Sequence, residues 1–237
     1  MKHFSFCLFL SAAALLASCA EEYKIAGRST VPTLDGKVLT LQAAELGNNN
    51  GVMVALDSCQ VVHGRFSFYG DVDTVCMAQV FVGTQAVMPI VLENGDLFIT
   101  VDNIGQRVSG GPMNEKLYKY INQQKRLYNE WNDLQNKYIE MARQGRTLAD
   151  IQHKLGPKFQ RNAEKSERLE TRFIVENADN VLGANYFMQL TEQYAFPVIT
   201  EQIREILRST PPVFQQHPYV DAYIRAARLN PLSVPLK

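Results

Sequence analysis

Four cysteines carry the most versatile chemistry in this chain: Cys7, Cys19, Cys59 and Cys76. A thiol reacts as its thiolate, so redox centres pair cysteines as Cys-x-x-Cys and lower their pKa. No Cys-x-x-Cys occurs here. Cys59 and Cys76 stand 17 positions apart, and segments with strand character place them on either side of a strand at Phe66–Phe68, about 9–10 Å from each other. Because a disulfide needs Cα atoms within about 7 Å, this spacing predicts two buried, unpaired thiols.

Cys19 differs from the other cysteines in what precedes it. Residues 1–3 form a basic tip, residues 4–16 are almost entirely apolar, and Leu-Ala-Ser leads into Cys19. This order is typical of a signal peptide, and its apolar stretch is too short for a stable membrane-spanning helix. The Leu-Ala-Ser-Cys sequence resembles the bacterial lipobox, in which the cysteine is acylated and becomes the first residue after cleavage. We therefore predict a signal peptide at 1–18 and a lipid anchor on Cys19, with secretory cleavage near Ala17 or Ala20 as the alternative.

Residues 19–22 are interpreted as a short lipidated tether in the cell envelope. Ala20-Glu21-Glu22 resembles the acidic tract that directs some Bacteroidota lipoproteins to the outer face of the outer membrane. An outer-membrane lipoprotein that faces the periplasm is the alternative. Formal charge balances at +0, and no basic stripe with interleaved aromatics appears, so nucleic acid is not an expected partner. The expected partner is the membrane, which the lipid on Cys19 would enter.

Other kinds of catalytic and metal chemistry find no support in the spacing of residues. His63, His153 and His217 are isolated, and no H-E-x-x-H, G-x-S-x-G or phosphate-binding loop occurs. Asp71-Val72-Asp73 begins like a calcium loop, but the later glycine and glutamate are missing. We therefore predict no catalytic residue, no cofactor and no metal ligand.

Aromatic residues offer the one candidate for ligand contact. Trp131 and Tyr128, with Tyr120 and Tyr138 nearby, could form a platform for a glycan or a peptide. Three of these four residues fall on a regular apolar seam, which favours packing in a helical core instead. Both interpretations stay open, with Trp131 and Tyr128 as the candidate contacts.

The segments before residue 111 have the texture of antiparallel strands, with short β-branched or aromatic runs between turn residues. The expected strands cover residues 23–28, 38–43, 52–62, 65–70, 75–82, 89–92 and 97–101. Two hairpins are predicted from their turns. One turns at His63-Gly64, and the other turns at Glu93-Asn94-Gly95-Asp96, where Asn-Gly favours a tight reversal.

After Gly110-Gly111-Pro112 the apolar period lengthens to that of a helix. Spacings of three and four run through a seam whose members are Leu117, Tyr120, Gln124, Leu127, Trp131, Leu134, Tyr138 and Met141. Gly145 should end this helix, and Thr147 should cap a second, antiparallel one that Gly156-Pro157 breaks or kinks. Shorter helices are expected at 181–194, 200–208 and 218–229.

These elements predict an α+β fold. An antiparallel β-sandwich-like domain at 23–111 precedes an α-helical domain at 112–229 with a long antiparallel helical hairpin, and 230–237 forms a C-terminal tail. The length of 237 residues accommodates one or two such units.

Two stretches carry a resemblance to a known family. They are Asp57–Gly70, which reads D-S-x-x-V-x-x-G-x-F-x-F-x-G, and Pro89–Gly95 together with the Val108–Asn114 junction. They resemble the uncharacterised domain (domain of unknown function 4369) at the N-terminus of thiol-disulfide oxidoreductase-like lipoproteins of Bacteroidota. In fused relatives a thioredoxin-like domain with Cys-x-x-Cys follows, whereas this sequence ends at Lys237 without one. The family's oxidoreductase activity is therefore not expected here.

Three roles follow as hypotheses. The first is a non-catalytic, lipid-anchored binding or accessory module for an envelope protein, peptide or glycan. The second is a partner of a separate thioredoxin-like oxidoreductase. The third is a structural protein of the envelope.

Overall fold

The computed structural model describes residues 21–44, 53–72 and 74–236 and confirms the α+β class. The signal peptide and Cys19 lie outside these residues. The strands are β1 (Glu21–Ser29), β2 (Val38–Ala44), β3 (Met53–Gln60), β4 (Arg65–Val72), β5 (Cys76–Val82), β6 (Gln85–Leu92), β7 (Gly95–Val101) and β8 (Gln106–Ser109). A 3₁₀ turn, η1 (Pro32–Leu34), follows β1. The helices are α1 (Pro112–Arg143), α2 (Leu148–Glu176), α3 (Val181–Thr191), α4 (Glu201–Ser209), α5 (Pro212–Gln215) and α6 (Pro218–Arg228).

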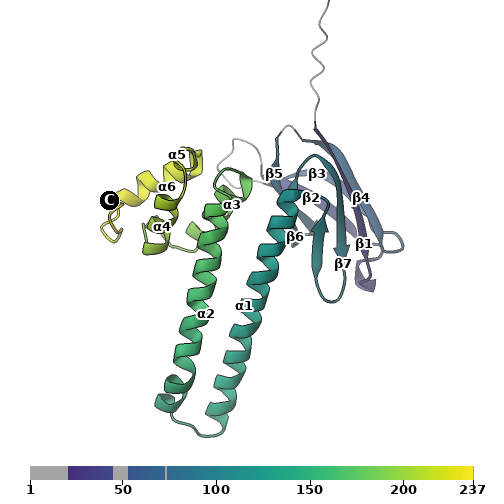
Figure 1. Ribbon diagram of the computed structural model, residues 1–237. Helices are drawn as coiled ribbons and strands as arrows, with labels where there is room; N and C mark the ends of the chain where they lie inside the picture. The colour runs from purple at the N-terminus through teal and green to yellow at the C-terminus, as the bar shows by residue number, and fades with distance from the viewer. Residues whose placement is uncertain (1–20, 45–52, 73, 237) are drawn as a thin grey trace, which may run out of the picture.

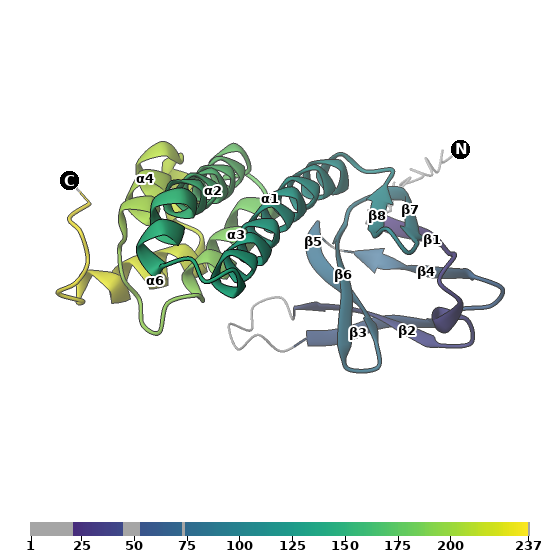
Figure 2. The ribbon, with the colours of Figure 1, turned by 90° about the horizontal axis from the view of Figure 1, so that it is seen from below.

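The strands form two four-stranded sheets that pack as a sandwich (Figure 2). Sheet A has the order β4-β1-β7-β8, and sheet B has the order β3-β2-β5-β6. Alternate residues point inward, as Tyr23 and Ile25 do on β1 and Leu39 and Leu41 do on β2. All neighbouring strands are antiparallel except β1 and β7, which run parallel. The sequence had predicted purely antiparallel sheets, and the parallel pair β1–β7 corrects that prediction.

The predicted hairpin at His63-Gly64 is wrong. The turn itself exists, because His63 and Gly64 both have positive φ (50° and 70°) and Val62 and Arg65 form a two-hydrogen-bond bridge. However, β3 pairs with β2 in sheet B, whereas β4 pairs with β1 in sheet A. A tight turn fixes a local reversal of the chain but not the partner of each strand, and here it carries the chain from one sheet to the other.

The second predicted hairpin, at Glu93–Asp96, is wrong for the same reason. It joins β6 of sheet B to β7 of sheet A. Hairpin partners are instead β2 with β3, β5 with β6, and β7 with β8. The last strand of sheet A, β8, was not foreseen, since Gln106–Ser109 is only four residues long and three of these residues are polar.

Helices α1 and α2 form a long arm that leaves the sandwich (Figure 1). With 32 residues, α1 is about 48 Å long. Gly145 follows the last residues of α1 with φ +76°, as predicted for the end of that helix. The Thr147 hydroxyl accepts a hydrogen bond from the Asp150 amide, as predicted for a capped N-terminus. Pro157 does not break α2, which runs from Leu148 to Glu176 as one helix.

The remaining helices pack beside the inner end of the arm. Phe187 of α3 contacts the rings of Phe214 and Tyr223 edge-on. Residues 230–236 have no regular structure but fold back, because Ser233 accepts a hydrogen bond from the Ile199 amide and donates one to the Ala227 carbonyl.

The arm points away from the end of the sandwich where β1 begins. Gly95, at the start of β7, lies opposite Tyr23 near the start of β1, and α1 begins at that same end. Farther along α1, the Lys125 ammonium donates a hydrogen bond to the Ile104 carbonyl, in the β7–β8 loop at the opposite end. The helix beyond Lys125 therefore extends past the sandwich (Figure 1).

Candidate functional site

The arm is joined to the sandwich by a buried polar lock. The Glu93 carboxylate, 5% exposed, accepts hydrogen bonds from the amides of Met113 and Asn114 (3.2 and 2.9 Å). Asn114, fully buried, exchanges two hydrogen bonds with the backbone of Val91 and donates one to Glu93. An anion at a helix N-terminus satisfies free amides and complements the helix dipole. Glu93 therefore fixes where α1 starts and in which direction it leaves the sheet.

Sequence reasoning missed this lock because it assigned Glu93 to a hairpin turn. The signal lay in two segments already noted together, Pro89–Gly95 and Val108–Asn114, which meet at this junction. Gly111 is required here, since a Cβ at that position would overlap the Glu93 side chain.

The root of the arm is an aromatic cluster. Tyr120 stacks on Phe173 (centroids 4.0 Å, 11°), and Tyr186 meets both rings edge-on. All three are at most 6% exposed. Burial raises the pKa of the Tyr120 and Tyr186 hydroxyls far above the usual value, so both remain neutral. Tyr120 is thus a core residue and cannot belong to an exposed platform.

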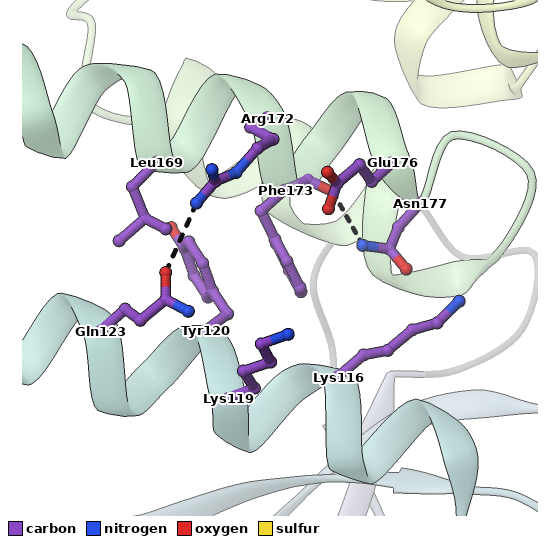
Figure 3. Close-up of a pocket in the computed structure, with 9 residues that line it drawn as sticks. All are labelled: Lys116, Lys119, Tyr120, Gln123, Leu169, Arg172, Phe173, Glu176 and Asn177. Carbon is purple, nitrogen blue, oxygen red and sulfur yellow. Dashed lines mark hydrogen bonds between the residues drawn. The ribbon is translucent and has the colours of Figure 1, made fainter.

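A pocket of about 530 Å³ opens above this cluster between α1 and α2 (Figure 3). Lys116 and Lys119 rise from α1, and Arg172 and Glu176 come from α2. The Arg172 guanidinium donates a long hydrogen bond (3.5 Å) to the side-chain oxygen Oε1 of Gln123. The two lysines and Arg172 make the pocket basic, and Glu176 contributes one carboxylate. The rings of Tyr120 and Phe173 lie below.

The candidate site is an aromatic groove farther out on the arm. Trp131 lines two neighbouring hollows of about 680 and 660 Å³, which also share Asn162 and Ser166. Its indole is half-buried and packs edge-on against Phe159 (5.0 Å, 82°). Tyr128 lines one hollow and is 66% exposed. We call these two hollows the Trp131 groove.

The structure thus divides the four aromatic residues of the predicted platform. Trp131 and Tyr128 line the same hollow, Tyr138 lines the second hollow and packs with the apolar cluster at the tip, and Tyr120 lies in the core. Three of the four residues therefore line the Trp131 groove, with Tyr128 the most exposed, and Tyr120 does not.

Polar side chains with little net charge complete the groove. Asn162 donates to the Leu127 carbonyl (3.0 Å), and Gln202 donates to the Glu170 carboxylate (3.0 Å). Burial raises the pKa of Glu170 above its usual value, although the bond from Gln202 opposes this. Rings beside amide, hydroxyl and carboxyl groups provide stacking and hydrogen bonding, the two interactions that a polyhydroxylated or peptide ligand uses.

The two thiols of the sandwich lie apart from this groove. Cys59 and Cys76 are both free and half-buried. The strand between β3 and β5 is β2 and not, as the sequence had indicated, the strand at Phe66–Phe68. Burial is the main cause that raises the pKa of each thiol, so both stay protonated at neutral pH.

Metal-binding and membrane-spanning features were also sought in residues 21–44, 53–72 and 74–236. Within these ranges, no three His, Cys, Asp or Glu side chains gather as a metal site would require. None of the helices in this part of the chain combines the length and the apolar character needed to cross a bilayer.

The N-terminal part of the chain matches a known family. Residues 23–117 match the model of the domain of unknown function DUF4369. The match spans the whole sandwich and ends within α1, three residues after Asn114. No curated protein matches the chain. The DUF4369 region therefore includes the Glu93–Asn114 lock, while the Trp131 groove lies outside it.

Proposed function

We propose that this chain is a lipid-anchored cell-envelope protein that acts as a non-catalytic binding module, and that the Trp131 groove takes a glycan. The observation that carries the proposal is the groove itself: an accessible tyrosine and a half-buried tryptophan beside amides and a hydroxyl, on a rigidly rooted arm.

The geometry suits a protein held at its N-terminus. Strand β1 begins at Glu21, two positions after Cys19, so an acyl group on Cys19 would bring that end of the sandwich close to the bilayer. Trp131 is the twentieth residue of α1, about 28 Å along the helix from the end near β1. The groove would then stand clear of the lipid headgroups, where a glycan is accessible.

A non-catalytic role is supported by the state of the thiols. Thiol exchange and nucleophilic attack need a thiolate, and burial disfavours that form at both Cys59 and Cys76. Both cysteines also lie in the sandwich, away from the Trp131 groove.

Calorimetric titration with soluble envelope oligosaccharides tests the binding. We expect the wild type to bind, and Tyr128→Ala to weaken binding about tenfold, because one aromatic contact contributes roughly 1–1.5 kcal/mol. Phe196→Ala is the matched control, since Phe196 is an aromatic residue of comparable exposure (53%) that does not line the groove. Binding of peptides but no oligosaccharide would contradict the glycan assignment, and equal losses in both variants would contradict the site.

Mass spectrometry of the mature N-terminus tests the anchor separately. We expect an acylated Cys19 as the first residue. An unmodified N-terminal residue would contradict this part of the proposal while leaving the groove unaffected.

A further inference from the structure

Three arginines align across the outer face of sheet A. Arg28 of β1 lies directly opposite Arg65 of β4 on one side and Thr100 of β7 on the other, and Thr100 lies opposite Arg107 of β8. All three arginines are exposed and each is followed by a buried residue, so their side chains share the outer face. Adjacent strands are about 4.8 Å apart, so the arginine row spans about 14 Å.

This arrangement opposes the stability of the sheet. Like charges directly across a strand pair repel each other. Within the described residues, no ion pair forms at Arg28 or Arg65, and Arg107 has only Asp102 near enough to matter electrostatically. Arg28 and Arg65 are thus adjacent cations without an ion-pair partner among the described residues, and an external anion bound there would lower the free energy.

The surroundings of the row have the composition of a protein interface. One row along, Phe98 is 53% exposed between Ala26 and Ser109, and Tyr69 on β4 is 61% exposed. Interfaces are enriched in arginine and aromatic residues, and guanidinium groups bind carboxylates in a bidentate geometry. We propose that the outer face of sheet A docks an acidic segment of a partner protein, whose carboxylates lie along the arginine row.

The charges at the other end of this face orient the partner. Glu22, Asp71 and Asp96 are exposed there, near the start of β1, and Lys24 pairs with Glu22 (3.9 Å). The acidic end lies about 20 Å from the arginine row, as six residues of strand separate Glu22 from Arg28. An acidic segment is therefore attracted to one end of the face and repelled from the other.

A second copy of the chain fits this face less well. It would have to pack antiparallel to bring its Glu22 and Asp71 over the arginines, which turns the two β1 N-termini to opposite ends of the pair. Because β1 begins two residues after Cys19, the anchor proposed above could not then hold both chains in one membrane. This step and the next one rest on the proposed function. The same placement sets the arginine row away from the headgroups, which disfavours a lipid ligand.

Fluorescence anisotropy of a labelled fifteen-residue poly-glutamate peptide tests the proposal with the purified full-length chain at low salt. We expect each of Arg28→Gln, Arg65→Gln and Arg107→Gln to weaken binding about threefold, and the triple variant about thirtyfold. The matched control is Lys116→Gln/Lys119→Gln/Arg172→Gln, which removes the same charge from the pocket of Figure 3 and should change binding by less than about twofold.

Three results would overturn the proposal. The first is an equal or larger loss in the control triple variant. The second is arginine-dependent binding to phosphatidylglycerol vesicles without binding to the peptide, which would make the ligand a membrane. The third is a dimer, seen by light scattering, that the arginine variants dissociate. If Arg65 served only to stabilise the fold, Arg65→Gln would lower the melting temperature. If Arg65 is kept for binding, the substitution relieves repulsion from Arg28, and the melting temperature should stay equal or rise.

Discussion

The inner and outer halves of the arm both carry aromatic residues on facing helices, but they bury them to different extents. At the root, Tyr120 and Phe173 stack with at most 6% exposure beneath a continuous core that includes both sheets. Farther out, Trp131 and Tyr128 remain accessible, and only Leu134, Ile151 and Leu155 form a small separate buried cluster. Exposed rings contribute little to the stability of the fold and can contact a ligand. The root of the arm therefore stabilises the structure, and the outer half is the part available for ligand binding.

The largest test of this comparison removes a ring from each half. Phe173→Ala should lower the free energy of unfolding by about 3–5 kcal/mol, because it opens a cavity in the root. Phe159→Ala, at the half-buried partner of Trp131, should lower it by only about 1–2 kcal/mol. Urea unfolding followed by circular dichroism measures both. Equal losses would mean that the outer half is as much a core as the root.

A second test compares two buried asparagines. Asn114→Ala leaves the Val91 amide and part of the Glu93 carboxylate unpaired, so it should cost about 3 kcal/mol. Asn162→Ala removes a bond to one carbonyl on the arm and should cost about 1 kcal/mol. The same unfolding measurement applies. A cost at Asn114 no larger than at Asn162 would show that the lock does not hold the arm.

The sequence predicted the elements better than their connections. Alternating residues such as Phe66 and Phe68 defined strands, and the seam from Leu117 to Met141 defined α1, because both patterns are local. The partners of β4 and β7 depend on contacts between distant segments, which a turn such as His63-Gly64 does not encode.

The sites show the same limit. Trp131 and Tyr128 could be named from their type and spacing, and the structure places both on one groove. Glu93 needed its distant partner Asn114 to be interpretable. The arginine row needed the register of four strands, one of which, β8, the sequence did not reveal.

A third, smaller effect should appear in the outer half of the arm. Gly156 lies inside α2 directly before Pro157, and apart from its neighbours in the chain an added Cβ would meet the Gln152 side chain at 3.6 Å. Gly156→Ala should gain about 1 kcal/mol of helix propensity, but the ring of Pro157 crowds a Cβ on the preceding residue, so we expect a net change in stability of less than about 1 kcal/mol. Chemical denaturation measures this change. A gain of the full amount would mean that Pro157 does not crowd the residue before it.

The smallest effect concerns pH at the groove. Burial raises the pKa of Glu170 in the folded state, so stability is lost as the pH rises from the ordinary pKa of a glutamate through that raised value. Glu170→Gln keeps an acceptor for Gln202 and should stabilise the protein at pH 7 by less than about 1 kcal/mol. The gap between variant and wild type should shrink as pH falls towards 4, where Glu170 is protonated in both states. Thermal melts across this range would contradict the account if the gap widened in acid.

The central claim is that the outer half of the arm binds the ligand, and Trp131 is the one tryptophan in the chain, so its fluorescence reports on the groove directly. We expect a saturable change in emission when envelope oligosaccharides are titrated into the wild type, and a loss of that change in Tyr128→Ala. Oligosaccharide binding seen by calorimetry without any change in Trp131 emission would place the ligand elsewhere and contradict the claim.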